Sequence, residues 1–348
     1  MDPNTHQKKT LRYETIDIAK AFAIILVVVG HFQSPYMPHG YEIMRSVIYL
    51  FHMPLFVFVS GFLYIATWRP TSYKHFVVKK FKRLMIPYLF VSIIIIGLKL
   101  LTPGAMTVEN PVTCHAFLEI FYSPAAGFFL WFIWALWWMM LIIPLFHTPA
   151  SRFWLFILSI PLHFYSHLLP ETFCLKESAN MLVFFCAGSI TADYMNIKTT
   201  NRLNSGWQII SILFFILCAS VLLTHQFPPG FRFSSILFLI TNFSGIAMFL
   251  SLSNYWRLYA PKKILQQTFS IAYSSFLIYL LHTTFEGLAK AILYKYDWFM
   301  LHPLLVSAWI GATIVILCGT LIPYWLGTNI FSKFKLTSFL FGIQHNAR

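Results

Sequence analysis

Lys20 and His31 are the two residues of this chain whose types and spacing point most directly to chemistry. They lie eleven residues apart in one apolar stretch, IDIAKAFAIILVVVGHF. In a helix, eleven residues return to within about 20° of the starting direction and cover roughly 16 Å of axis. Asp17, three residues before Lys20, falls near the same stripe. An acid, an amine and an imidazole on one helix face could together move a proton.

A second pair of ionisable residues, His282 and Glu286, lies in the stretch SIAYSSFLIYLLHTTFEG. Their i, i+4 spacing places them on one helix face, where the carboxylate could accept a hydrogen bond from the imidazole and orient it. His163 and His167 have the same spacing. No carboxylate or cysteine accompanies them at a matching spacing, so we predict no metal site.

A third cluster lies in YLFHMPLFVFVSGFLY, where His52 is followed about two turns later by Ser60 and Gly61. Small residues allow helices to approach closely, so Ser60 and Gly61, taken alone, are more readily explained by helix packing. His52, taken alone, is more readily explained as an interface histidine. Three histidines from three segments at similar depth (His31, His52 and His282) nevertheless indicate a shared site.

Composition indicates the environment in which these residues act. Of the 348 residues, 58% are hydrophobic and only 10% are charged, and the mean hydropathy is +0.68. These values are typical of an integral membrane protein, in which ionisable residues within a span are functional by default. We predict an all-α, polytopic transmembrane helical bundle of about ten spans, near residues 16–33, 45–67, 84–101, 128–146, 152–169, 180–195, 207–224, 233–253, 268–289 and 302–326.

The distribution of positive charge predicts the orientation. With the N-terminus inside, 19 of the 25 Lys and Arg residues fall on the cytoplasmic side and six on the outer side, so the positive-inside rule places both termini in the cytoplasm. The net charge of +14 then requires no nucleic acid to explain it. We predict a cytoplasmic tail over 1–15, a transmembrane domain over 16–326 and a cytoplasmic tail over 327–348.

The densest positive charge lies in a short run after the second predicted span, at Lys79, Lys80, Lys82 and Arg83. Anchoring against acidic lipid headgroups would explain such a run. Arg83 fits that explanation less well, because it adjoins the apolar start of the third span. The run is therefore also a candidate site for an anionic ligand.

These residues carry a family resemblance. In order, the segments DIAKAFAIILVVVGH, FHMPLFVFVSGF, KKFKRLMIPY, FFLWFIWALWW and YSSFLIYLLH resemble acyltransferase family 3, and within it the fucose 4-O-acetylase-like, polysaccharide-modifying branch. The basic-x10-His motif of that family falls on Lys20 and His31, its paired basic residues on Lys80 and Arg83, and its C-terminal histidine on His282. Lys stands at 20 and 80 where many members carry Arg, which replaces a bidentate fork by a point charge.

The resemblance implies a multi-pass enzyme of the bacterial inner membrane, in contact with membrane lipids. The donor would be acetyl-CoA, with succinyl as an alternative acyl group, and the acceptor a hydroxyl of a cell-surface glycan or its lipid-linked precursor. No metal is expected. The catalytic candidates are His31 as general base, with Lys20, Asp17, His282 and Glu286. The phosphates of coenzyme A would bind Lys79, Lys80, Lys82 and Arg83. Further site candidates are His52, Ser60 and Trp131, and the oxyanion would be stabilised by Ser60, Trp131 or a backbone N–H.

Two other classes of function fit the residues taken without the resemblance. A transporter or flippase would use buried ionisable groups as a substrate or proton site. A structural subunit of a glycan-export complex would need none of them for catalysis. Binding of acetyl-CoA separates the enzyme from the carrier.

Overall fold

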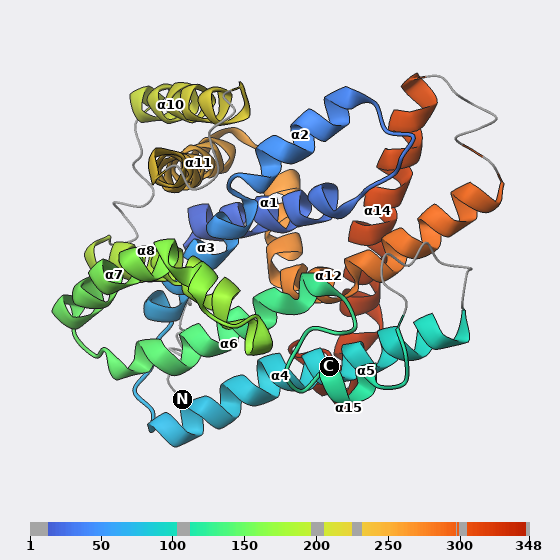
Figure 1. The fold of residues 1–348 in the computed structure, drawn as a ribbon, viewed down its shortest axis with the longest axis horizontal. Coiled ribbons are helices and arrows are strands. Elements are labelled where there is room, and N and C mark those ends of the chain that lie inside the picture. The colour runs from blue at the N-terminus through green and yellow to red at the C-terminus, as the bar shows by residue number, and fades with distance from the viewer. Residues whose placement is uncertain are drawn as a thin grey trace, which may run out of the picture.

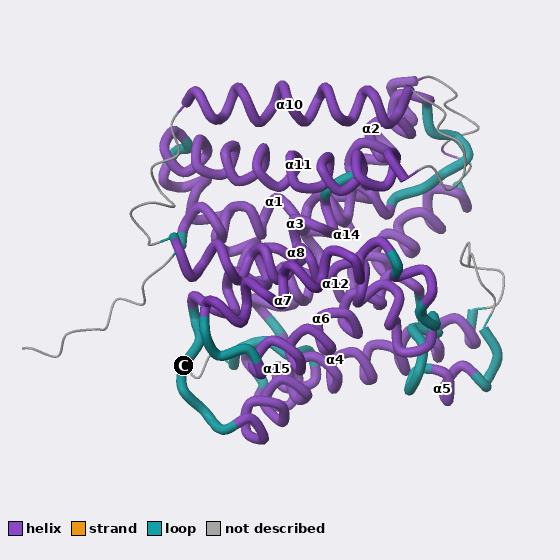
Figure 2. The backbone as a smooth tube through the Cα atoms, turned by 60° about the vertical axis from the view of Figure 1, so that its left-hand side comes forward, coloured by secondary structure: helices purple, strands orange, loops and turns teal. Residues whose placement is uncertain are grey.

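The computed structural model describes residues 13–102, 112–195, 205–224, 232–296, 298 and 305–345. Within these ranges every element is a helix and there is no strand, as Figure 2 shows. This confirms the predicted all-α class. Most of the predicted N-terminal tail, 1–15, lies outside the described residues.

The main helices follow one another along the chain. Short 3-10 turns border several of them, including Phe128–Leu130 before α6. The helices are α1 (Glu14–His31), α2 (His39–Tyr49), α3 (His52–Ala66), α4 (Tyr73–Leu101), α5 (Ala116–Glu119), α6 (Trp131–Ile142), α7 (Pro149–Phe164), α8 (Leu175–Tyr194), α10 (Ser205–Thr224), α11 (Arg232–Tyr259), α12 (Lys262–Lys295), α14 (Leu305–Asn329) and α15 (Lys335–Leu340).

Eight helical segments within the described ranges are long and apolar enough to cross a membrane. Helices also cover the other two predicted spans. Of these, α1 carries three charged residues within its 18, and α7 is only 16 residues long. The multi-pass architecture is therefore confirmed, whereas ten spans and cytoplasmic termini stay predictions. The eight segments are His39–Ala66, Tyr73–Leu101, Phe128–Leu145, Thr172–Tyr194, Gly206–Thr224, Ser234–Tyr259, Lys262–Lys295 and Val306–Lys333.

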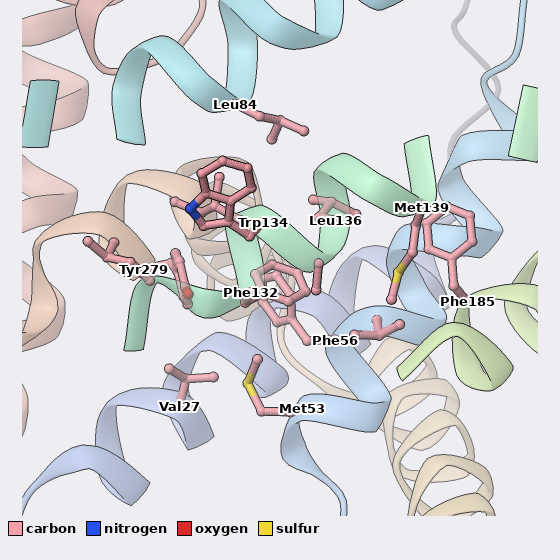
Figure 3. Close-up of a cluster of buried hydrophobic side chains, with 14 of the residues drawn as sticks. Val27, Met53, Phe56, Leu84, Phe132, Trp134, Leu136, Met139, Phe185 and Tyr279 are labelled. Carbon is pink, nitrogen blue, oxygen red and sulfur yellow. The ribbon is translucent and has the colours of Figure 1, made fainter. Parts of the chain in front are cut away.

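Helix α1 lies inside the bundle and contacts α2, α3, α11, α12 and α14 (Figure 1). Its alanines and its glycine, at 19, 21, 23 and 30, are buried, which lets neighbouring helices approach its backbone. In the core, side chains from α1, α3, α6 and α12 meet around Val27, Met53, Phe132 and Tyr279 (Figure 3). The bundle is thus packed around the helix that carries Lys20 and His31.

The predicted span 45–67 is divided in two by a break at Leu50 and Phe51, where α2 ends and α3 begins. Pro54 explains the break, because a proline cannot donate to the carbonyl four residues earlier, that of Leu50, and its ring crowds that carbonyl. His52 Nδ1 donates a hydrogen bond to the carbonyl of Ile48 at 2.9 Å, and the backbone N–H of Phe51 donates to the same carbonyl at 3.1 Å.

Helices α3 and α8 approach each other through two glycines. A Cβ on Gly61 would lie 2.0 Å from the carbonyl oxygen of Phe185, and a Cβ on Gly188 would lie 2.0 Å from that of Phe58. Ser189 on α8 donates across the same contact to the carbonyl of Gly61 at 3.3 Å. The packing explanation for Gly61 is therefore confirmed.

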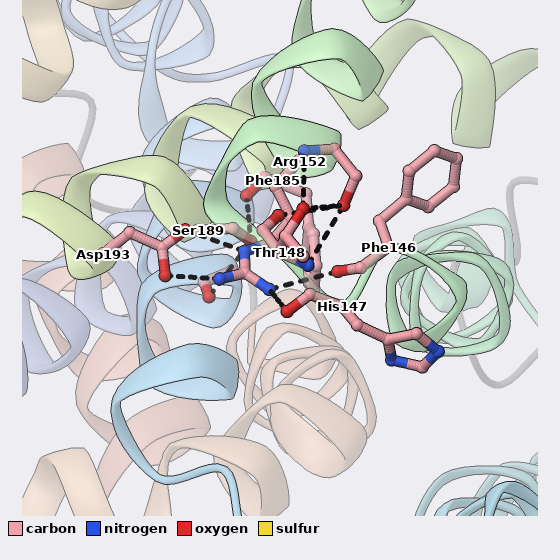
Figure 4. A network of polar contacts seen from close by, with 9 residues as sticks. Phe146, His147, Thr148, Arg152, Phe185, Ser189 and Asp193 are labelled. Carbon is pink, nitrogen blue, oxygen red and sulfur yellow. Dashed lines mark hydrogen bonds and ion pairs between the residues drawn. The ribbon is translucent and has the colours of Figure 1, made fainter.

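A buried ion pair ties α7 to α8 (Figure 4). The Arg152 guanidinium donates to both carboxylate oxygens of Asp193, at 2.7 and 2.6 Å. Its remaining nitrogen, Nη1, donates to the carbonyls of Phe146 and His147, each at 3.0 Å. This bidentate geometry satisfies a buried charge and fixes the connection between α6 and α7.

The glycine contact gives a stability prediction. Gly61→Ala and Gly188→Ala should each destabilise the protein by roughly 1–3 kcal/mol or more, because a methyl group would force the two backbones apart. Thermal unfolding in detergent measures the effect. Gly97→Ala is the matched control, since nothing lies within 4 Å of a Cβ at that position of α4. Equal unfolding temperatures for Gly61→Ala and Gly97→Ala would contradict the close contact.

Candidate active site

The central feature of the site is the contact between two imidazoles from distant parts of the chain. His31 is the last residue of α1, and His282 lies midway along α12. Their ring centroids are 5.0 Å apart with an interplanar angle of 63°. His282 is fully buried and His31 is half-buried. The structure thus brings together two of the histidines that the sequence singled out.

His282 is held by its own helix. Its Nδ1 lies 2.7 Å from the carbonyl oxygen of Tyr279. Because a carbonyl only accepts, Nδ1 carries the proton, and Nε2 of the neutral ring presents a lone pair. Nε2 is buried and has no hydrogen-bond partner among the described residues. Tyr279 in turn donates its hydroxyl hydrogen to the carbonyl of Phe129, whose ring centroid is 5.4 Å from that of His282.

Glu286 lies one turn further along α12 and is buried. The hydrogen bond expected between His282 and Glu286 is not formed, because Nδ1 of His282 is used by Tyr279, while Nε2 of His282 and Oε1 of Glu286 both lack partners in the part of the chain described. Gly319 of α14 packs directly on this carboxylate. A Cβ there would lie 2.7 Å from Cγ and 3.0 Å from Oε1 of Glu286.

A pocket of about 330 Å³ opens beside these residues. His31 and Glu286 line it, and His282 lies behind His31. Ionisable, hydroxyl, amide and aromatic side chains share its wall. Besides His31 and Glu286, the lining residues are Phe32, Gln33, Tyr49, Ile95, Leu98, Lys99, Ala126, Gly127, Phe128, Phe129, Thr283, Thr284, Gly287 and Lys290.

The opposite end of α1 carries the other half of the predicted constellation. Lys20 is half-buried, and its charge is attracted by Asp17 and repelled by Arg83 of α4. Lys80 is also half-buried, and its Nζ lies over the rings of Phe76 and Tyr64, 5.3 and 6.0 Å from the centroids.

The remaining members of the basic run, Lys79 and Lys82, are exposed, as is Arg83. A single helix therefore connects the basic cluster (Lys20, Lys80 and Arg83) to the pocket at His31.

Three other candidates from the sequence do not line the pocket. His52 interacts electrostatically with His31, but its Nδ1 supports the carbonyl of Ile48. The Ser60 hydroxyl donates to the carbonyl of Phe56 at 2.8 Å. Trp131 packs edge-on against Phe132. These contacts give His52 and Ser60 structural explanations.

Several residues in or near the pocket were not predicted from the sequence. Arg45 of α2 interacts electrostatically with His31, lies over the ring of Tyr49, 5.3 Å from its centroid, and has a buried Nε with no hydrogen-bond partner among the described residues. Lys99 and Lys290 line the pocket itself. One signal could have found them, because all three belong to the six basic residues that the predicted topology leaves on the outer side.

Comparison with known proteins supports group transfer as the chemistry of this site. Residues 13–328 match the family model described as an acyltransferase domain, that of the acyltransferase 3 family. The chain belongs to this family and is a multi-pass membrane acyltransferase. The match confirms the resemblance to this family, whereas the polysaccharide-modifying branch and the roles of Lys20, His31, Lys80, Arg83 and His282 stay predictions.

One curated relative adds a partial match. The nodulation protein NolL of Sinorhizobium fredii (strain NBRC 101917 / NGR234) is 35% identical over 134 residues. The alignment covers 35% of this chain and 33% of NolL, so the chain matches about a third of the length of that relative. No solved structure matches the chain.

The contact between Gly319 and Glu286 gives a prediction about the site. Gly319→Ala should displace the Glu286 side chain and lower acyl transfer by about tenfold or more, since small misplacements in an active site are costly. Transfer by the purified variant, with thermal unfolding in parallel, measures this. Gly97→Ala should leave both properties unchanged. A fully active Gly319→Ala enzyme would show that the position of Glu286 is unimportant.

Proposed function

We propose that this protein is an O-acetyltransferase that moves an acetyl group from acetyl-CoA to a hydroxyl of a cell-surface glycan or of its lipid-linked precursor, in a bacterial inner membrane. The observation that carries the proposal is the pocket in which His31 is exposed to a ligand and is backed by His282. Its setting, in a chain of the acyltransferase 3 family, supports acyl transfer as the chemistry.

In the proposed mechanism, His31 is the general base. It removes the proton from the acceptor hydroxyl as the oxygen attacks the thioester carbonyl, and a tetrahedral intermediate forms. The intermediate collapses with cleavage of the C–S bond, and the proton on His31 passes to the departing coenzyme A thiolate. His282 packs behind the ring of His31, and its Nε2 has no hydrogen-bond partner among the described residues. We assign to this imidazole the stabilisation of the positive charge that develops on His31.

The oxyanion requires a donor that the first candidates do not supply. Ser60 donates to a backbone carbonyl, and Trp131 does not line the pocket. Arg45 has an unpartnered N–H and interacts electrostatically with His31. Arg45 does not line the pocket either, so we assign to it a long-range role, in which its positive charge favours the developing oxyanion.

The donor would bind at the basic cluster. Coenzyme A is made in the cytosol and carries phosphates, which match the charges of Lys20, Lys80 and Arg83. The distance along α1 from Lys20 to His31, about 16 Å, suits the extended pantetheine arm that joins the phosphates to the thioester. The acceptor would then occupy the pocket at His31.

One feature of the structure would also fit a transporter, because carriers contain discontinuous helices like α2–α3. The family match favours the enzyme. Transfer of isotopically labelled acetyl from acetyl-CoA by purified protein tests the choice, because a carrier has no reason to bind or consume this thioester.

His31→Ala should reduce acyl transfer by roughly 10²-fold to 10⁴-fold, the usual effect of losing a general base. Mass spectrometry of glycan acetylation in a deletion strain that expresses the variant measures the loss. His167→Ala is the control, because His167 is exposed and lies outside the pocket. Near-normal acetylation by well-expressed His31→Ala protein would overturn the assignment.

Lys80→Gln and Arg83→Gln should each weaken the affinity for acetyl-CoA by about tenfold, the value of one hydrogen bond to a charged group. Titration of coenzyme A against the purified variants at several salt concentrations measures the change. Lys74→Gln removes an exposed charge from the first turn of the same helix and should bind normally. Normal affinity together with poor membrane insertion would show that the basic run only anchors the chain.

A further inference from the structure

Two amines line the pocket at His31. Lys99 comes from the last turn of α4 and Lys290 from the outer part of α12. Both side chains are half-buried, so neither extends fully into solvent. Lys290 Nζ donates to the carbonyl of Gln33 at 3.4 Å. The fold therefore places both lysines in the pocket wall.

The positions of these lysines differ from those of membrane anchors. Positive charge that anchors a membrane protein gathers on the cytoplasmic side. The predicted topology leaves only six Lys and Arg on the outer side. Two of them, Lys99 and Lys290, line this one pocket, and a third, Arg45, interacts with His31. Such a concentration of sparse charges indicates a ligand.

Acidic and basic side chains occupy different positions along the pocket. Glu286 lies next to His282, and Lys290 lies one turn further along α12. Thr283, Thr284 and Gln33 supply hydroxyl and amide groups to the same lining, and Phe128 and Tyr49 supply aromatic surface. Hydroxyl-bonding groups beside aromatic rings suit a sugar. A volume of about 330 Å³ is at the small end for ligand pockets, which suits one sugar unit better than a whole nucleotide.

We infer that the acceptor is acidic: the sugar whose hydroxyl faces His31 carries a carboxylate or a phosphate, and Lys99 and Lys290 bind that group. This inference rests on the proposed function for the identity of the pocket as the acceptor site. It adds the charge of the substrate and the residues that recognise it. Amines that bind an anion form charge-assisted hydrogen bonds, which are stronger than neutral ones.

Peptide-resolved amine labelling tests binding without any acyl transfer. Purified protein in detergent is treated with an amine-reactive ester alone, or with methyl glucuronide, glucose 1-phosphate, methyl glucoside or coenzyme A. Methyl glucuronide or glucose 1-phosphate should slow the labelling of Lys99 and Lys290 at concentrations where methyl glucoside does not. Exposed Lys295, on the same helix but outside the pocket, serves as the internal control.

Variants measure the contribution of each amine. In the Lys290→Gln variant, the acidic ligand should bind about tenfold more weakly, so that about tenfold more of it is needed to protect Lys99 from labelling. In the Lys99→Gln variant, the protection of Lys290 should weaken in the same way. Lys295→Gln should bind as the wild type does. Three results would each overturn the inference. They are equal protection by methyl glucoside, protection by coenzyme A alone, and no protection by either acidic ligand. Acetyl transfer to a neutral glycan with no protection by acids would overturn it while leaving the proposed function intact.

Discussion

The contact between His31 and His282 is the interaction on which the rest of the site depends. It joins the end of α1 to the middle of α12, two helices separated by most of the sequence. Tyr279 fixes His282 through its backbone carbonyl and fixes Phe129 through its hydroxyl, so one residue positions both an imidazole and the pocket wall beside it. If α1 and α12 moved apart, the pocket would lose the base that we propose and the imidazole behind it together.

Keeping ionisable side chains inside an apolar bundle places demands on the surrounding packing. Each such group loses hydration, and it remains only where the structure supplies partners or a ligand. The glycine contact between α3 and α8 and the Arg152–Asp193 pair make one side of the bundle rigid through backbone proximity and a fully bonded charge. By contrast, Nε2 of His282 and Oε1 of Glu286 are buried without partners among the described residues. Glu286 lines the pocket and His282 packs against His31, so both of these unpartnered atoms lie at the pocket or directly behind its wall.

Sequence reasoning was most successful where a feature depends on one helix. The apolar runs predicted the all-α membrane fold, and an eleven-residue spacing linked Lys20 to His31. It failed where side-chain geometry or packing between distant segments decides. The i, i+4 spacing placed His282 and Glu286 on one face, but the ring of His282 bonds to its own helix. Lys99 and Lys290 are separated by most of the chain, and only the packing of α4 near α12 shows that they share a pocket.

The separation of charge along α1 gives the proposed reaction a direction. The basic cluster of Lys20, Lys80 and Arg83 lies at one end of the helix and the His31 pocket at the other, about 16 Å away. A donor bound by its phosphates at the first end needs to bring only its neutral thioester arm into the apolar interior. An acidic acceptor bound by Lys99 and Lys290 would likewise keep its charge near the other end. Only uncharged reacting groups would then meet at His31, which avoids the large cost of moving an ion through the centre of a bilayer.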